Sequence, residues 1–170
     1  MPQIKTTFGF HSTAEEVVNG IDLSETRIIV TGGSSGIGIE TARTLALTGA
    51  EVTLAVRNVE AGNIVAANIK ETTSNPKVAV AHLDLVDLAS VREFVGSWRG
   101  PLHILINNAG IMALPELVRT GEGYEMQFAT NFLGHFALTV GLHRFLATAI
   151  WCACRVAEFK CKYDCTGHLR

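Results

Sequence analysis

Short apolar segments alternate with longer segments of helical periodicity along most of the chain. Strand-like runs rich in β-branched residues are expected at 27–32, 51–56, 78–83 and 102–106. Apolar residues recur at helical spacing in the segments between them, at 37–49, 59–71 and 87–98, with Asp87 as the expected N-cap of the last. Strands that alternate with helices are typical of βαβ units, so the pattern predicts an α/β fold built on a parallel sheet.

A short leading helix is expected before the first strand. Ser12 with Glu15, and Thr13 with Glu16, form two overlapping capping-box patterns, and either pair would start a helix.

The last long apolar segment carries an aromatic stripe whose members fall four residues apart: Tyr124, Phe128, Phe132, Phe136 and Val140. The stripe is widened by Ala129, Leu133, Ala137 and Leu142. A helix at 122–146 that is apolar over most of its circumference is expected to be buried on more than one side, against its own sheet and against a second copy of the chain. A single core helix within a monomer is the equal alternative.

Composition and charge narrow the range of partners. The 170 residues, 48% hydrophobic and 18% charged, are enough for one domain with a sizeable core. A net charge of -2 gives no overall attraction for nucleic acid or an anionic membrane, so a small-molecule partner is favoured. The apolar run 132–154 is interrupted by His135, His143 and Arg144, which argues against a membrane span. Because the first residues also lack the apolar core of a secretory signal, a cytoplasmic location is expected.

The segment T-G-G-S-S-G-I-G, residues 31–38, lies at the expected turn between the first strand and the following helix. Backbone N–H groups and the helix dipole favour a bound diphosphate at such a turn. Gly32 and Gly36 permit a tight turn and close approach of the backbone, and Gly38 lets the helix pack against the strand. The spacing G-x-x-x-G-x-G, with no G-K-[S/T] after it, argues against a triphosphate P-loop. A glycine turn without a ligand is the alternative.

Two further motifs accompany the glycine-rich segment. N-N-A-G, residues 107–110, follows the fourth strand, at the edge where open α/β sheets bind ligands. Asn131 lies in the segment T-N-F-L-G-H-F. Together these motifs resemble the short-chain dehydrogenase/reductase family from 31 to 146. The segments F-G-F-H-S-T-A-E-E-V-V-N-G-I-D-L-S and A-V-R-N are similar to its retinol-dehydrogenase-like and WW-domain-oxidoreductase-like branch.

This resemblance implies an incomplete α/β fold, a Rossmann-type doubly wound parallel sheet with about four of seven strands recognisable. It divides the chain into a leading segment, 1–26, a dinucleotide-binding region, 27–147, and an atypical cysteine-rich tail, 148–170. Because strands five to seven are not recognisable, the strand at 102–106 would be an open sheet edge, prone to pairing with a partner.

The resemblance also implies roles for individual residues. The residues expected to line a cofactor diphosphate are Gly32, Ser34, Ser35, Gly36, Ile37 and Gly38. Asp84 and Leu85 would face the adenine. Near the adenosine ribose and beneath the nicotinamide, the resemblance implies Asn107, Ala109 and Gly110. Asn131 would be the catalytic asparagine, which helps hold a water in the proton relay. The residues alone also allow Asp84 to cap a turn and Asn131 to be a satisfied core polar group.

Arg57 bears on the choice of cofactor. About twenty residues beyond the glycine-rich loop, an acid that binds the ribose 2′-OH is typical of NAD-binding folds, whereas an arginine there suits a 2′-phosphate. A guanidinium offers phosphate a planar fork of donors, so NADP is expected and NAD is the alternative. A solvated Arg57 that selects neither cofactor also remains open.

The catalytic tyrosine and lysine of the family, Y-x-x-x-K, are not recognisable. Tyr124 is followed four residues later by Phe128, and Tyr163 by Gly167. There is no serine after Ser97, so the expected serine of a fifth strand is missing as well. In this family the lysine lowers the pKa of the tyrosine that gives the proton, so we expect the chain to be truncated before its catalytic pair and inactive as it stands.

All four cysteines fall in the tail: Cys152, Cys154, Cys161 and Cys165. Zinc binding is conceivable, but the tail lacks C-x₂-C knuckles and glycine turns, so no metal site is expected. Disulfides are not favoured in a cytoplasmic chain. The abrupt change of composition favours an out-of-frame or prematurely terminated ending.

Two classes of function remain. The first is an NAD(P)-dependent oxidoreductase that transfers hydride between NADP(H) and a small hydrophobic alcohol or carbonyl compound. The second is a non-catalytic dinucleotide-binding or interaction fragment.

Overall fold

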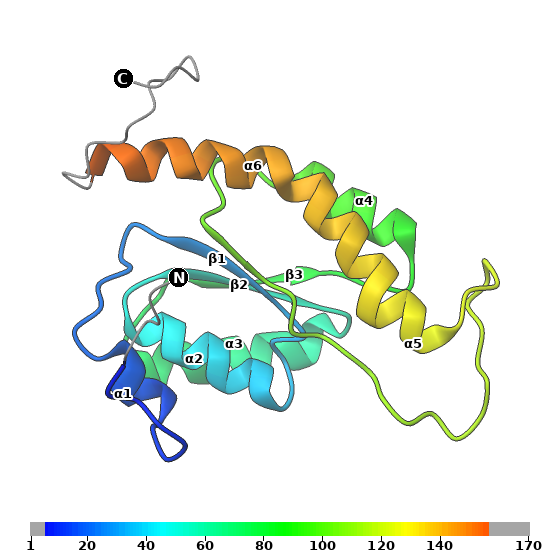
Figure 1. Ribbon diagram of the computed structural model, residues 1–170, viewed down its shortest axis with the longest axis horizontal. Coiled ribbons are helices and arrows are strands. Elements are labelled where there is room, and N and C mark those ends of the chain that lie inside the picture. The colour runs from blue at the N-terminus through cyan, green and yellow to red at the C-terminus, as the bar shows by residue number, and fades with distance from the viewer. Residues whose placement is uncertain (1–5, 157–170) are drawn as a thin grey trace.

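In the computed structural model, which describes residues 6–156 and the side chains as far as Ala149, helices and strands alternate (Figure 1). In chain order the elements are α1 (Ala14–Val18), β1 (Arg27–Thr31), α2 (Ile37–Leu47), β2 (Glu51–Val56), α3 (Val59–Thr73), β3 (Val78–His82), α4 (Leu88–Ser97), β4 (Ile104–Ile106), α5 (Met126–Phe128), the π-helical turn η1 (Ala129–Leu133) and α6 (Gly134–Val156). Each predicted strand and helix is present.

The sheet is parallel, with the strand order β3-β2-β1-β4. The chain moves outward from β1 to β3 and then crosses back to add β4 on the other side of β1. This reversal of direction between β1 and β4 is the topological switch point at which open α/β sheets bind ligands. The doubly wound parallel fold is therefore confirmed, and among the described strands β4 forms one edge, as expected.

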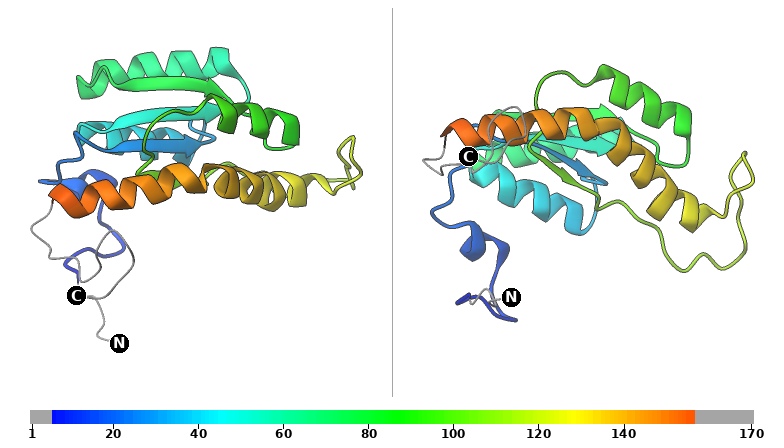
Figure 2. Two further views of the ribbon diagram at one scale, coloured as in Figure 1. Left: turned by 90° about the horizontal axis from the view of Figure 1, so that it is seen from above. Right: turned by 45° about the horizontal axis from the view of Figure 1, so that its top comes forward.

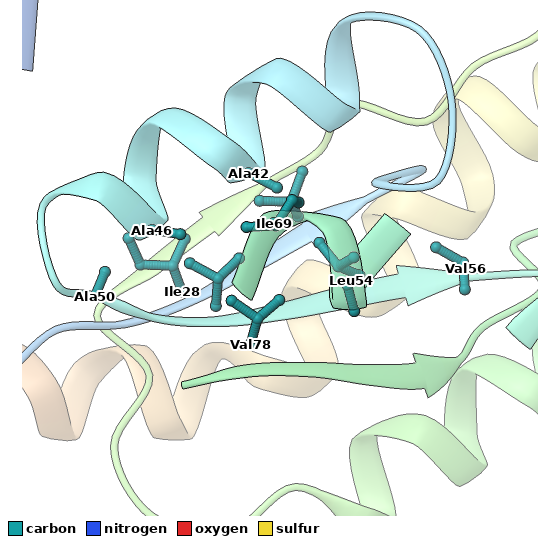
Figure 3. Close-up of a cluster of buried hydrophobic side chains, with 11 residues drawn as sticks. Ile28, Ala42, Ala46, Ala50, Leu54, Val56, Ile69 and Val78 are labelled. Carbon is teal, nitrogen blue, oxygen red and sulfur yellow. The ribbon is translucent and has the colours of Figure 1, made fainter. Parts of the chain in front are cut away.

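Helices cover both faces of the sheet. Below it in Figure 1 lie α2 and α3, and above it lie α4 and α6. The core on the α2 and α3 side consists of small and β-branched residues, several of which are labelled in Figure 3: Ile28, Val30, Ala42, Ala46, Ala50, Val52, Leu54, Val56, Ala66, Ile69 and Val78. Larger side chains fill the other side: Ile29, Ala55, Leu83, Leu85, Val91, Phe94, Trp98, Leu102, Leu138 and Leu142. Burial of β1 and β2 on both faces explains their near-continuous apolar runs in the sequence.

Local hydrogen bonds set the ends of several elements. The Thr13 hydroxyl accepts the Glu16 amide and completes the capping box of α1, while the Ser12 hydroxyl accepts the Gly9 amide and is no helix cap. Asp87 caps α4 as predicted. The strand predicted from residue 102 begins at Ile104, because the Leu102 amide donates to the Phe145 carbonyl on α6 and so leaves the ladder.

The aromatic stripe does not face the sheet. Tyr124 precedes α5, whose first amides donate to the carboxylate of Glu125. Phe128, Phe132 and Phe136 stack on one another, yet they are 47%, 58% and 57% exposed. The helical segment is buried on its sheet side, as expected, but the aromatic members of the stripe are not on that side. The buried face is lined by Ala129 and Leu142 from the wider stripe, together with Thr130, His135, Leu138 and Ala149. Burial against a second copy of the chain stays a prediction.

The segments from α5 to α6 form one long rod over the sheet, and the connection from β4 to α5 projects past the end of the sheet (Figure 2). Within residues 6–156, no helix combines the length and apolar character that crossing a membrane requires.

Candidate cofactor site

An open cleft of about 790 Å³ lies at the carboxyl edge of the sheet. This volume falls within the range of about 300–1,000 Å³ that is typical of small-molecule sites. Every strand end contributes to its wall, as do the segment after β4, α5 and η1. The lining residues are Gly32, Ser34–Gly38, Ala55–Asn58, Leu83–Val86, Asn108–Ile111, Leu114, Val118, Met126 and Thr130. Thus every residue predicted to bind a cofactor, apart from Asn107, lies on this cleft.

The glycine-rich loop forms the wall between β1 and β2. Gly32 has a φ of +67°, and a Cβ there would lie 2.9 Å from the Cα of Ala109. A Cβ on Gly38 would clash with the carbonyl of Gly32 and lie 2.7 Å from the Nδ2 of Asn108. Because these two positions admit no side chain, the loop backbone packs directly on the segment after β4 and turns into α2. The first amides of α2 are thereby brought to the cleft, where they favour an anionic group.

Side-chain hydrogen bonds form the adjoining wall, between β1 and β4. The Thr31 Oγ1 accepts the amides of Asn108 at 2.9 Å and Ala109 at 3.0 Å. The Nδ2 of Asn108 donates to the Thr31 carbonyl at 2.9 Å. These bonds fix the N-N-A-G segment to the end of β1. Sequence reasoning overlooked Asn108, although its signal was available: a buried threonine that ends an apolar strand needs a polar partner.

Asn107 occupies a different place from its neighbour. Its Nδ2 donates to the Oγ1 of Thr139 on α6 at 3.1 Å, and the residue does not line the cleft. Its contact with a cofactor stays a prediction.

Asn131 lies in the π-helical turn η1, a feature frequent at functional sites. Its Oδ1 accepts the Ile111 amide at 2.9 Å, and its Nδ2 donates to the Ile111 carbonyl at 2.8 Å. One turn earlier, the Oε1 of Gln127 accepts the Ala113 amide at 3.1 Å. The two side chains therefore hold the segment that leads away from the cleft floor, and Asn131 itself lies beside the cleft rather than on its lining.

Two further parts of the wall come from β2 and β3. Arg57 follows β2, is exposed, and forms no ion pair among the described residues. Asp84 follows β3 and uses one carboxylate oxygen to accept the Val86 amide at 3.0 Å, while Leu85 beside it is buried. Asp84 thus caps a turn, which is the alternative role that the sequence allowed for this residue.

The far end of the cleft is mainly apolar. It is lined by residues that lack a periodic pattern and were not predicted: Ile111, Leu114, Val118 and Met126. The Val118 carbonyl accepts the Met126 amide, which ties the projecting segment to the start of α5.

The residues present fit a dinucleotide better than a metal ion. Amides of a helix N-terminus, a backbone cradle that admits no Cβ and a free guanidinium suit phosphate groups. Between residues 6 and 149, no three metal-ligating side chains come together. The side chains of the four cysteines lie outside the described residues.

The fold and this cleft define an α/β domain of the dinucleotide-binding kind. The sequence model of the short chain dehydrogenase family matches residues 26–151, and the chain belongs to that family. A probable oxidoreductase of Streptomyces lividans is 50% identical over 76% of this chain and 43% of its own length. Retinol dehydrogenase 11 of Homo sapiens is 49% identical over 66% of this chain and 36% of its own length. The WW domain-containing oxidoreductase of Gallus gallus is 43% identical over 81% of this chain and 34% of its own length.

A solved structure of an uncharacterized protein from Mycobacterium paratuberculosis superposes with a TM-score of 0.67, at 42% identity. The matched region covers 74% of this chain and 44% of the chain in the solved structure. The resemblance to the retinol-dehydrogenase-like and WW-domain-oxidoreductase-like proteins is therefore confirmed. The chain spans less than half the length of the curated relatives that it matches.

Proposed function

We propose that the chain binds NADP across the cleft, as the cofactor-binding part of an oxidoreductase that acts on a hydrophobic alcohol or carbonyl compound. The observation that carries the proposal is a single cleft, at the switch point of the sheet, lined by both the glycine-rich loop and the segment after β4. The amides of Ser34–Gly38 would hold the diphosphate, and Ala109 and Gly110 would support the nicotinamide half. When bound, the nicotinamide supplies or accepts the hydride.

Arg57 supports NADP over NAD. Its guanidinium lies on the cleft and is not neutralised, whereas Arg27 and Arg43 pair with Glu51 and Glu40 among the described residues. A 2′-phosphate would therefore meet an unpaired cation in a fork geometry that suits it.

The cofactor choice is tested by titrating the chain with NADP and with NAD. We expect tighter binding of NADP, and Arg57→Asp should reverse the order, because losing a charge-assisted contact costs about 1.5–3 kcal/mol. Arg92→Asp is the matched control, since this exposed arginine on α4 lies off the cleft. Equal affinity of the unaltered chain for both cofactors would remove the role of Arg57, and no binding of either would refute the proposed function.

The apolar end of the cleft supports a hydrophobic substrate. Ile111, Leu114, Val118 and Met126 would exclude water from one side of the nicotinamide half. The names of two relatives, retinol dehydrogenase 11 and polyprenol dehydrogenase, are those of enzymes for alcohols with long hydrocarbon parts.

We further propose that the 170-residue chain by itself binds cofactor but reduces no carbonyl compound. Neither of its two tyrosines is followed by a lysine four residues later, and Tyr124 is exposed and off the cleft. Loss of a positioned proton donor removes a contribution of about 10² to 10⁴-fold. Asn131 does not replace the missing proton donor. Its side-chain amide does not give up a proton at neutral pH, and it is already hydrogen-bonded to the backbone of Ile111.

Carbonyl reduction by the chain is measured as the loss of NADPH absorbance with a panel of aldehydes and ketones, including retinal. No turnover above background is expected for the unaltered chain or for Asn131→Ala. Turnover at an ordinary enzyme rate that disappears in Asn131→Ala would show that the chain is catalytic.

The second class of function, a non-catalytic binding or interaction fragment, is favoured by the exposed stack of Phe128, Phe132 and Phe136. A homo-oligomer through this face would bury it. Light scattering across a concentration series should then show a dimer or larger species that Phe132→Glu dissociates; a monomer at every concentration would contradict it.

A further inference from the structure

A chain of buried hydrogen bonds connects the start of α6 to the N-N-A-G segment. His135 is 7% exposed, and its Nε2 lies 2.9 Å from the Oγ1 of Thr31. Its Nδ1 lies 3.3 Å from the carbonyl oxygen of Asn131. Thr31 is fully buried, and its hydroxyl oxygen also accepts the amides of Asn108 and Ala109. The ring of His135 thus lies directly behind the wall of the cleft that the N-N-A-G segment forms.

The partners of the ring select one tautomer. A carbonyl oxygen only accepts hydrogen bonds, so the bond to Asn131 requires a proton on Nδ1. The Thr31 hydroxyl has two acceptor sites and one proton, and the amides of Asn108 and Ala109 fill both acceptor sites. Its proton can donate to the Nε2 of His135 at 2.9 Å or to the Ile106 carbonyl at 3.3 Å, and in either case the oxygen has no acceptor site left for a proton on Nε2. Both ends of the ring lead to the same neutral form, protonated on Nδ1.

A second proton on the ring is incompatible with this arrangement. Protonated Nε2 needs an acceptor, and the only atom within hydrogen-bond distance that is described there is the Thr31 oxygen. That oxygen would then face three donors with two acceptor sites. One of the two amides, Asn108 or Ala109, must lose its bond to Thr31; Asn108 would then keep only its second acceptor, the Ile106 carbonyl at 3.1 Å, whereas Ala109 would be left without a described acceptor. The Thr31 proton would turn to the Ile106 carbonyl, which lies 3.3 Å away.

Among the side chains that the structure describes, no charged group compensates a proton on the ring. Burial lowers the pKa of His135, and the bond to the Asn131 carbonyl opposes that shift only in part. Thr31 and the segment 107–111 carry no charge, and Arg27 and His103 lie toward the opposite end of their strands. The titratable residues on the other neighbouring segments, none of which contributes to the shift, are Asp84, Asp87, Arg92, Glu93 and His143.

We propose that His135 is a positioning residue that fixes the N-N-A-G wall of the cleft while its ring is neutral and releases that wall when the ring is protonated. The link to cofactor affinity rests on the proposed function, whereas the link between the ring and the two amides does not.

The ring and the amides are measured directly by NMR on the unaltered, ¹⁵N-labelled chain between pH 7.5 and 5.5. At pH 7.5 the nitrogen shifts of His135 should report the form protonated on Nδ1, and the amides of Asn108 and Ala109 should be protected from exchange. As the ring takes up a proton, the protection factor of at least one of these amides should fall. A ring protonated on Nε2 at pH 7.5 would overturn the proposal. So would unchanged protection, or a chain that unfolds before the ring takes up a proton.

His135→Gln provides a matched variant, because its Oε1 accepts from the Thr31 hydroxyl and does not titrate. Protection of the two amides should then be independent of pH. If this variant does not fold, the ring and amide measurements on the unaltered chain decide the matter alone.

Cofactor affinity gives the second readout. NAD is the probe, because the 2′-phosphate of NADP itself titrates near pH 6. From pH 7.5 to 5.5 the unaltered chain should lose about threefold to tenfold more affinity than His135→Gln, since one linked proton changes affinity by at most about tenfold per pH unit. Equal losses would contradict the link to the cofactor. If neither protein binds NAD or NADP at pH 7.5, the proposed function fails, while the NMR result still decides the role of His135.

Discussion

The two walls of the cleft are built by different means. Between β1 and β2 the wall is backbone, and its shape depends on glycines that leave no room for a side chain. Between β1 and β4 the wall is held by side chains of Thr31, Asn108 and Asn131, whose hydrogen bonds join residues 77 apart (Thr31 and Asn108) and 20 apart (Ile111 and Asn131) in sequence. A backbone wall tolerates no added atom, whereas a side-chain wall loses its bonds one at a time and can respond to protonation.

The largest effect is expected in the backbone wall, from Gly38→Ala. The added Cβ meets the Gly32 carbonyl and the Nδ2 of Asn108, and backbone cannot move aside cheaply. We expect a loss of about 3 kcal/mol in the free energy of unfolding, together with loss of NADP binding. Urea denaturation and a cofactor titration measure both.

Gly96→Ala is the matched control, because a Cβ on this glycine near the end of α4 meets nothing within 4 Å. It should raise stability by about 0.5–1 kcal/mol, the usual gain for glycine to alanine in a helix. Similar destabilisation by both substitutions would show that close approach at Gly38 is not what matters.

The side-chain wall should respond less, to Asn108→Ala. This change removes the bond to the Thr31 carbonyl and leaves a partly buried acceptor, at a cost of about 1–2 kcal/mol. Asn107→Ala removes a bond between exposed side chains and should cost about 0.5 kcal/mol or less. Thermal unfolding and NADP affinity should both rank Asn108→Ala as the more harmful variant. The opposite ranking for affinity would restore Asn107 as the cofactor residue.

The smallest effect is the dependence of stability on pH through His135. Its pKa in the folded chain lies below the ordinary value of 6.5, because burial disfavours the charged ring. As pH falls through 6.5, the unfolded chain takes up a proton that the folded chain does not, so stability must fall until the folded pKa is passed. Urea midpoints from pH 7 to 5.5 should decline more steeply for the unaltered chain than for His135→Gln. This window lies above the range of Asp22 and Glu125, whose pKa values are lowered by hydrogen bonds from nearby residues, chiefly backbone amides. Parallel curves would remove His135 from the pH response.

The contrast between the walls also explains what the sequence could and could not predict. The backbone wall is local: the glycine spacing, the preceding strand and the following helix are contiguous, so its residues were identified together. The side-chain wall depends on which face of each segment meets Thr31, and no local pattern encodes that. In the sequence His135 is therefore seen only as an interruption of an apolar run, and no local pattern indicates that Asn108 lines the cleft.

The orientation of the aromatic stripe could not be predicted for a related reason. Spacing of four correctly predicted one helical face, but periodicity does not say whether that face meets the sheet. Small residues and His135 face inward, since they allow the helix to approach the segments after β1 and β3, and the phenylalanines face out. The four strands were easier to predict, because each is a short apolar run, and β1 and β2 are buried on both faces.

The most direct test of the central claim, that both walls bind one dinucleotide, is an NADP titration of the ¹⁵N-labelled chain followed by amide chemical shifts. Saturable shifts are expected at Ser34–Gly38 on one wall and at Ala109 and Gly110 on the other, with α1 unaffected. Saturable binding that shifts other amides and leaves both of these segments unchanged would contradict the account.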